Sequence, residues 1–224
     1  CCMMENEQRE NDELDILQLQ EDFEKPGEEK KFNWKKEMLD WVQAIVIAIV
    51  IALLIKNFVF TLVQVEGDSM LPTLQNSNRL YVNRFMYTPQ KGDIIIFKPE
   101  DDPKRPYIKR VIATEGDTVY IDYESSTVYV NDEPIEEPYI KEPTRLIGTY
   151  ISRLMNTGNY SRQQPIIVEK DKIFVMGDNR NHSRDSREIG LVDKKQIIGG
   201  AVFRFWPLNE FGSLDVETTT EFMD

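Results

Sequence analysis

A long apolar segment near the N-terminus constrains the fold of this chain more than any other feature. Residues 41–55 read WVQAIVIAIVIALLI, and after a two-residue polar break the apolar character resumes through Val63. As a helix, residues 41–63 would be about 34 Å long at about 1.5 Å per residue, and the hydrocarbon core of a bilayer is about 30 Å thick. The sequence therefore predicts a transmembrane anchor helix over residues 37–63.

The charges beside this segment predict its orientation. Four lysines precede it (Lys30, Lys31, Lys35 and Lys36), and no comparable cluster follows it closely. The positive-inside rule then places the N-terminus in the cytoplasm and everything after Val63 outside the cell. A cleaved signal peptide and a buried core helix are the alternatives. Bulky residues from Phe58 to Val65 disfavour the first, and the near absence of polar residues disfavours the second.

Both ends of the chain read as polar tails. Residues 1–30 hold eleven acidic and three basic residues, so residues 1–36 are predicted to be an acidic disordered cytoplasmic tail with a basic flank. A short amphipathic helix over residues 14–23 is the alternative. Cys1 and Cys2 are adjacent and cannot staple a fold, although a lipidated pair stays open. Residues 208–224 are predicted to be a polar C-terminal tail.

Composition excludes several classes of partner. The 224 residues include 39 acidic and 27 basic residues, for a formal net charge of −12, which argues against a nucleic-acid partner. The chain has two cysteines and one histidine, so it offers no zinc cluster, and it contains neither a P-loop nor a GxGxxG motif. We therefore expect no metal and no cofactor.

From Leu62 onward the sequence has the pattern of short strands separated by turns. Turns recur about every ten residues, which predicts a mainly β, antiparallel fold for an extracytoplasmic domain over residues 64–207. Residues 131–164 are rich in Pro, Glu, Tyr and Ser and indicate an inserted β-hairpin subdomain at about 122–172. The predicted strands are 62–66, 79–83, 93–97, 107–113, 118–122, 128–131, 166–169, 172–176 and 199–206.

Two short blocks suggest a nucleophile and its base. Residues 67–74 read GDSMLPTL, and Ser69 in this block needs a base because a serine hydroxyl is a weak nucleophile. The chain's one histidine is His182, but Lys109 lies in the apolar run YIKRVIA. Strand alternation puts Lys109 on one face with Tyr107 and Val111, where desolvation would lower its pKa toward neutrality.

A third block, GDNRNHSRDSREIG at residues 177–190, carries the side chains to support such a pair. Asp178 and Asp185 can form charge-assisted hydrogen bonds with Arg180 and Arg187 and so fix a loop. Ser183 could hold the lysine amine in position. A polar surface loop is the alternative interpretation of this block.

Together these three blocks resemble the signature boxes of the bacterial type I signal peptidases. GDIIIF at residues 92–97 resembles the family's box between the first two, and residues 128–131, 137–140 and 204–207 resemble its accessory patterns. The similarity covers about 41–207. The resemblance implies a membrane-anchored serine endopeptidase with a Ser–Lys dyad. Such an enzyme removes signal peptides from exported preproteins after small residues (Ala-x-Ala), at the outer face of the cell membrane.

The resemblance also implies a role for individual residues. Ser69 matches the nucleophile, Lys109 the general base, and Ser183 the serine that orients the lysine. Some members carry a hydroxyl residue two positions before the nucleophile, where this chain has Gly67, so the oxyanion hole would rest chiefly on the Ser69 N–H. The residues matching those that hold the site together are Asp178, Asp185, Arg187 and Arg110. Those matching the shallow substrate pockets are Val63, Val65, Met70, Leu74 and Ile108.

Two other classes of function stay open on the sequence. One is a hydrolase that uses Ser69 with His182, because a triad is defined by geometry and not by order in the chain; an ER-type relative with histidine in place of the lysine is a variant of it. The other is a catalytically inactive, membrane-tethered β-domain that serves as a binding module.

Overall fold

The computed structural model describes residues 34–58, 60–145 and 147–214. The chain forms two units, Cys1–Val50 and Ile51–Asp224. The predicted acidic tail lies almost entirely outside the described residues, as do Cys1, Cys2 and the last ten residues of the predicted C-terminal tail.

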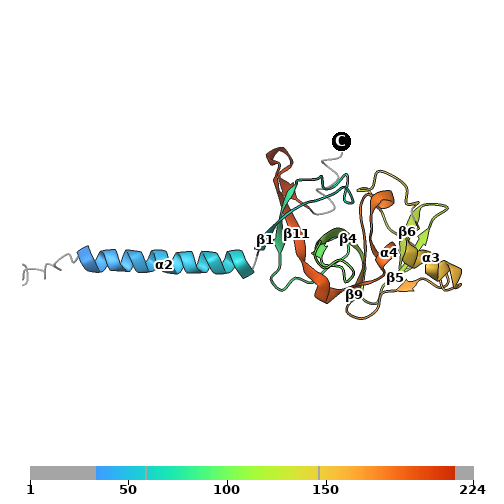
Figure 1. The fold of residues 1–224 in the computed structure, drawn as a ribbon, viewed down its shortest axis with the longest axis horizontal. Coiled ribbons are helices and arrows are strands. Elements are labelled where there is room, and N and C mark those ends of the chain that lie inside the picture. Colours follow the sequence, from blue (N-terminus) through green and yellow to red (C-terminus); the bar gives the residue numbers. More distant parts are fainter. Residues whose placement is uncertain (1–33, 59, 146, 215–224) are drawn as a thin grey trace, which may run out of the picture. The chain divides into compact units, whose positions relative to one another are not determined.

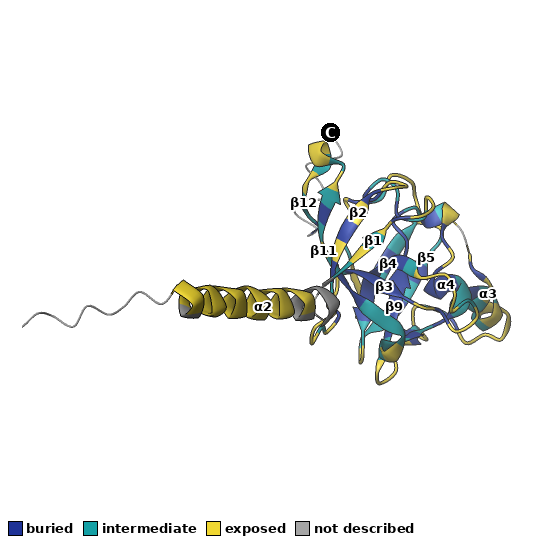
Figure 2. Cartoon of the chain, turned by 60° about the vertical axis from the view of Figure 1, so that its left-hand side comes forward, coloured by how far each residue is buried: buried dark blue, intermediate teal, exposed yellow. Residues whose placement is uncertain are grey.

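The first helix, α2 (Trp34–Phe58), begins near the start of the predicted anchor at residue 37 but ends before the predicted end at Val63. Its large apolar side chains from Trp41 to Leu53 are exposed, and Figure 2 shows this helix in the colour of exposed residues. No helix within the described ranges is both long enough and apolar enough to cross a membrane.

The expectation of helix as far as Val63 is wrong at its C-terminal end. Phe60–Gln64 forms strand β1, which pairs antiparallel with β2 (Arg79–Asn83) from Phe60 opposite Asn83 to Gln64 opposite Arg79. The strand contains the β-branched residues Thr61 and Val63, which favour strands, and a partner strand can satisfy the backbone groups as fully as a helix would.

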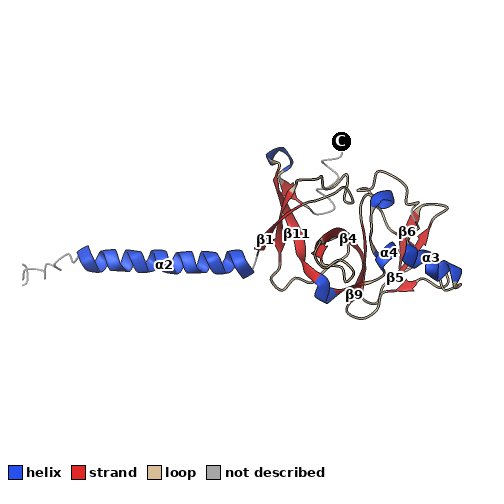
Figure 3. Cartoon of the chain, viewed as in Figure 1, coloured by secondary structure: helices blue, strands red, loops and turns tan. Residues whose placement is uncertain are grey.

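Most of the second unit is β-sheet (Figures 1 and 3). One sheet has eight strands in the order β1-β2-β11-β3-β4-β9-β10, with β12 pairing to β11, and the other has four in the order β7-β6-β5-β8. All strand pairs are antiparallel, which confirms the predicted mainly β class. The remaining strands are β3 (Ile94–Phe97), β4 (Tyr107–Thr114), β5 (Thr118–Asp122), β6 (Thr127–Val130), β7 (Glu133–Pro134), β8 (Ile166–Ile167), β9 (Lys172–Met176), β10 (Val192–Asp193), β11 (Ile197–Trp206) and β12 (Gly212–Ser213).

The centre of the larger sheet forms most of the core. Strand β3 is buried along its whole length because it lies between β11 and β4 and is covered on both faces. Strand β4 is buried from Ile108 to Ala113 for the same reason. Both faces of the sheet are therefore screened from water at β3 and β4, and any charged side chain on the buried part of β4 must be accommodated inside the protein.

The smaller sheet and its connections make up the region predicted as an insert. Strands β5 and β6 form a hairpin that lies before the stretch 131–164 in which a hairpin was expected. That stretch instead contains β7 and a helix that the sequence did not predict, α3 (Thr149–Asn156), which buries Ile151 in the core beside β5 and β6. The other helical segments are α4 (Ser186–Ile189), η1 (Arg180–His182), η2 (Lys194–Gln196) and η3 (Leu208–Glu210).

Candidate active site

Ser69 lies in the loop between β1 and β2. The loop turns at Gly67, whose φ of +85° lies in the left-handed region that favours glycine, and it is braced by a hydrogen bond from Leu74 N to Met70 O of 2.9 Å. A hydroxyl-bearing residue at position 67 would be strained in this backbone conformation. The carbonyl of Ser69 accepts a hydrogen bond of 3.1 Å from Asn179 N, which joins this loop to residues 177–187, called the arginine loop below.

Lys109 lies on β4, and its side chain contacts Ser69. Its Nζ donates to Ser69 Oγ at 2.8 Å and to Ile108 O at 2.8 Å, and it lies 5.3 Å from the ring centroid of Tyr107. The side chain is only 4 % exposed, and within the described residues it has no ion pair. Burial lowers the pKa of Lys109 to about 8; Asp185 and Asp178 oppose this effect, and Arg187 adds to it.

This geometry permits proton transfer between the two side chains. Above a pH of about 8 the amine is largely neutral, so the hydrogen bond can reverse and Ser69 Oγ–H can donate to Lys109 Nζ. A distance of 2.8 Å is within the range in which a base can take the proton of a nucleophile.

Buried arginine–carboxylate pairs surround Lys109. Arg110, the next residue on β4, donates to both carboxylate oxygens of Asp178 at 2.9 and 2.7 Å, and both side chains are fully buried. Arg187 holds Asp185 in the same two-point manner at 2.8 Å each, and Gly177 N donates to Asp185 at 2.9 Å. Burial alone would raise the pKa of Asp185, but the hydrogen bonds and charge of Arg187 outweigh it, and the pKa is lowered.

One ion pair expected within the arginine loop, between Arg180 and an aspartate of that loop, is not formed in the part of the chain that the structure describes. Arg180 pairs with Glu137 of the insert and not with an aspartate of its own loop. Thr73, which sequence reasoning also missed, donates to Asp178 at 2.5 Å. The signal for Glu137 was present, because the stretch 137–140 resembles a family pattern, but nothing in the sequence linked it to Arg180.

Ser183 is buried against Gly177, but among the described residues its Oγ makes no hydrogen bond to Lys109. The Oγ lies close enough to the carboxylate of Asp185 to help lower the pKa of that group. It packs on Gly177, where an added Cβ would lie 2.2 Å from Ser183 Oγ and 2.5 Å from Ser69 O. The absence of a side chain at position 177 therefore lets three parts of the site approach one another.

A groove with a volume of about 720 Å³ contains the Ser69–Lys109 pair. Four of the predicted pocket residues line it, namely Val63, Val65, Met70 and Ile108. Leu74 does not line it but is fully buried in the apolar cluster beneath. The sequence missed most of the other side of the groove, formed by Lys104, Arg105, Pro106, Tyr107 and Arg184.

His182 also lines the groove, on its exposed rim. In the part of the chain that the structure describes, its imidazole makes no hydrogen bond to Ser69, whereas Lys109 does. The geometry therefore favours the lysine over the histidine as the proton acceptor for Ser69.

A comparison with protein families identifies the family of the chain. Residues 38–206 match the family model described as "Signal peptidase, peptidase S26", which is well over half of the chain. The chain belongs to this family. It is accordingly a serine peptidase. This argues against the catalytically inactive binding module considered above.

Curated relatives of this signal peptidase family member match over most of their length. "Signal peptidase I" of Bacillus licheniformis is 41% identical over 192 residues, covering 84% of this chain and 99% of the relative. "Signal peptidase I S" of Bacillus subtilis (strain 168) is 42% identical over 183 residues, covering 79% and 93%. "Signal peptidase IB" of Staphylococcus aureus is 37% identical over 187 residues, covering 79% and 94%.

A crystal structure of a signal peptidase I from Enterococcus faecalis V583 was also matched. It is 26% identical, with a TM-score of 0.35, and the match covers 50% of this chain and 96% of that one.

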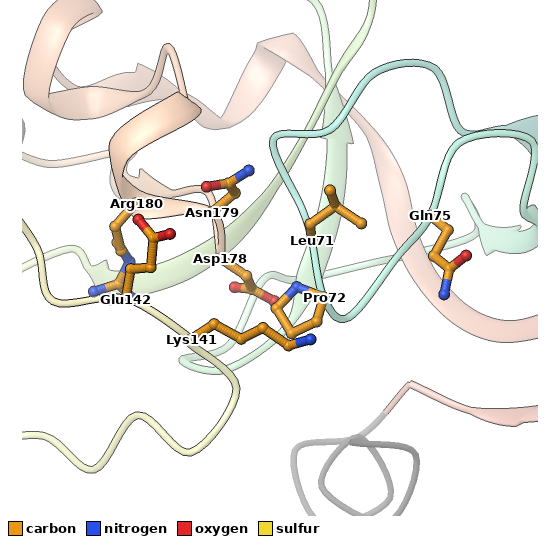
Figure 4. A pocket seen from close by; sticks show the side chains of 8 residues that line it. All are labelled: Leu71, Pro72, Gln75, Lys141, Glu142, Asp178, Asn179 and Arg180. Atoms are coloured by element: carbon orange, nitrogen blue, oxygen red, sulfur yellow. The ribbon is translucent and has the colours of Figure 1, made fainter. Parts of the chain in front are cut away.

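This family member has a second cavity, of about 270 Å³, lined in part by residues that follow Ser69 in the loop between β1 and β2 (Figure 4). Leu71 and Pro72, which follow the serine, form one wall, and Lys141 and Glu142 of the insert form another. Asp178, Asn179 and Arg180 lie between these walls. The insert and the arginine loop therefore lie side by side at this cavity.

Proposed function

We propose that this protein removes signal peptides from exported preproteins, with Ser69 as nucleophile and Lys109 as general base. The observation that carries the proposal is the 2.8 Å contact between Lys109 Nζ and Ser69 Oγ, made by a buried lysine without an ion-pair partner in the described part of the chain. Membership of the signal peptidase family supports the substrate class.

The proposed reaction begins when neutral Lys109 accepts the Ser69 proton as Oγ attacks the scissile carbonyl carbon. The N–H of Ser69, which donates no hydrogen bond to a described residue, would stabilise the negative charge on the carbonyl oxygen. The resulting lysine ammonium then gives its proton to the leaving amine. In the second half, Lys109 takes a proton from water as the water attacks the acyl-enzyme, and Ser69 recovers its proton.

The groove supports cleavage after small residues. Strand β1 is the outermost strand of its sheet, so an extended segment can add beside the chain that leads to Ser69. Alternate residues of such a segment would face the apolar floor formed by Val65, Met70 and Ile108. An Ala-x-Ala pattern suits this arrangement, since its two alanines fall on one face.

We further propose that the segment around α2 anchors the enzyme in the cell membrane, with the catalytic domain outside. The continuous apolar sequence of residues 41–55 and the exposed apolar side chains between Trp41 and Leu53 support this proposal. An anchor would raise the effective concentration of the enzyme where its substrates emerge from the membrane.

Cleavage of a preprotein with an Ala-x-Ala site tests the proposed function. The full chain in detergent micelles should release the mature protein, and Ser69→Ala should release none, with the product's new N-terminus determined by mass spectrometry. A substrate in which the second alanine is replaced by leucine is the control and should stay intact. If wild type and Ser69→Ala both fail to cleave the first substrate, the proposal is wrong and a binding module is favoured.

A further inference from the structure

We propose that the insert segment (residues 137–145) positions the catalytic groups from outside the three signature boxes, with Glu137 as the principal positioning residue. The inference rests on the proposed function, because it concerns the same Ser69–Lys109 pair. In the described part of the chain, the residues of this segment make no hydrogen bond to the side chain of Ser69 or of Lys109, so they would act through other residues.

The first link is the ion pair between Glu137 and Arg180. Arg180 donates to Glu137 Oε2 at 2.9 Å from Nη1 and to Oε1 at 2.5 Å from Nη2, and both side chains are almost completely buried. The remaining donor, Arg180 Nε, reaches Gly177 O at 3.0 Å. A two-point contact fixes the plane of the guanidinium group, so Glu137 also determines where Arg180 holds the backbone of Gly177.

The second link is the aromatic ring of Tyr139. The ring centroid lies 4.0 Å from Arg110 Cζ and 5.9 Å from Arg180 Cζ, and its hydroxyl donates to Glu137 at 3.3 Å. Tyr139 is buried. It therefore packs against the guanidinium of Arg110, the residue that immediately follows Lys109 on β4, and restricts its position.

The third link is made by the side chain of Asn181 in the arginine loop, which bonds to Glu142 and to the backbone of Pro143 and Arg145. Its Nδ2 donates to Glu142 Oε2 at 3.0 Å and to Pro143 O at 3.2 Å, and its Oδ1 accepts from Arg145 N at 3.1 Å. These bonds fix the segment 142–145 against the arginine loop with no flexible ion pair between them, and Figure 4 shows Glu142 lying next to Arg180.

The arginine loop passes this restraint on to the nucleophile. Asn179 donates from its backbone N to Ser69 O at 3.1 Å and from Nδ2 to Asp68 O at 3.0 Å. Gly177 lies directly against Ser69 O. The route from Glu137 to Ser69 is therefore Arg180, then the backbone of residues 177–179, then the serine loop.

Glu137 also completes a set of three buried ion pairs. The three pairs are Arg110–Asp178, Arg187–Asp185 and Arg180–Glu137, and charges of the first two act on Lys109. Two of these carboxylates come from the arginine loop, and the third comes from the insert. Removing it leaves a buried guanidinium without a counter-charge, which is costly, whereas removing both partners is far less so.

The test compares Glu137→Gln with a matched control in the full chain in detergent micelles. Asp132→Asn breaks an exposed ion pair of the same insert, with Arg162, and should leave kcat unchanged. For Glu137→Gln we expect kcat per acylation-competent molecule to fall about tenfold and KM to stay within about twofold, because displacement of a catalytic group mainly raises the barrier of the chemical step. The competent fraction is counted from the burst of first-turnover product.

A double variant separates positioning from mere stability. Glu137→Gln with Arg180→Met removes both buried charges, so the thermal midpoint should rise above that of Glu137→Gln. If Glu137 positions the site, kcat should nevertheless stay low, because Gly177 has lost Arg180. Recovery of kcat together with the midpoint would overturn the inference, and so would a Glu137→Gln variant that turns over like Asp132→Asn.

A surface variant keeps the inference testable if Glu137→Gln does not fold. Asn181→Ala removes the backbone ties of the third link without unpairing a buried charge, and we expect about a threefold loss in kcat with an unchanged thermal midpoint. An unchanged kcat in this variant would count against the inference. Failure of the wild-type chain to cleave the preprotein is a different result, which rejects the proposed function instead.

Discussion

Strand β4 carries two buried basic residues next to each other in the sequence, Lys109 and Arg110, and only Arg110 has an ion-pair partner among the described residues. Arg110 meets Asp178 through two hydrogen bonds, and both side chains are fully buried. Lys109 is almost as deeply buried but contacts only neutral oxygens, those of Ser69 and Ile108. The difference shows how one strand can supply both a structural and a chemical group. A paired guanidinium keeps its charge, and an unpaired amine can lose its own.

The largest expected effect is loss of the unpaired cation. Lys109→Met should reduce kcat/KM by about 10³–10⁴-fold, since general base catalysis would be lost while the shape of the groove is largely kept. Cleavage of a fluorogenic signal-peptide substrate measures this. Lys98→Met, at an exposed lysine just after β3, is the control and should retain full activity. Comparable activity in the two variants would show that Lys109 is not the base.

Next in size is loss of the paired cation's partner. Asp178→Asn leaves Arg110 charged and buried without a carboxylate, so we expect the free energy of unfolding to fall by about 3–5 kcal/mol. Urea unfolding followed by circular dichroism measures this. The exposed pair Arg162–Asp132 offers the comparison, since breaking it with Asp132→Asn should cost less than about 1 kcal/mol. Equal costs at the two sites would mean that burial of the Arg110 pair has no energetic consequence.

The pH dependence of the rate distinguishes the two cations more finely. Burial lowers the pKa of Lys109 to about 8, and only its neutral form can accept the Ser69 proton. We therefore expect kcat/KM to fall about tenfold per pH unit below pH 8 and to level off above it. The profile should be recorded over a range in which circular dichroism shows the fold unchanged. A limb centred near pH 6.5 would point to a histidine, because that is its reference pKa.

The smallest expected effect is at His182. Its side chain is exposed on the rim of the groove, so His182→Ala should change kcat/KM by less than about threefold. The same fluorogenic assay, run beside Lys109→Met, measures this. A loss as large as that of Lys109→Met would revive the serine–histidine hydrolase.

Local patterns predicted the strands well because their residues carry the signal themselves. Arg79–Asn83, Thr118–Asp122 and Lys172–Met176 have the predicted bounds, and each alternates or is continuously apolar as its burial requires. Helix α3 was missed because it is short, begins after Gly148 without a side-chain cap, and buries only Ile151 fully. Its position depends on packing against the insert, which a local pattern does not contain.

The site was predictable in its residue types and less so in its pairings. Strand alternation indicated an apolar environment for Lys109, and the structure buries it next to Ser69. The partner of Arg180 could not be read from the sequence, since Glu137 lies 43 residues away and the chain between them forms helix α3 and a strand in each of the two sheets, β8 and β9. Ser183 was expected to hold the lysine, but among the described residues its hydroxyl makes no hydrogen bond to Lys109.

The close packing at Gly177 limits how this enzyme can change. Even a methyl group there would overlap with Ser183 Oγ and with the carbonyl of Ser69, two groups that belong to different loops. A substitution at this position would not be absorbed by a flexible side chain, because the Ser69 carbonyl is backbone. Sequence drift in the protein can therefore alter the walls of the groove one residue at a time, whereas the spacing between nucleophile and arginine loop can change only if both loops change together.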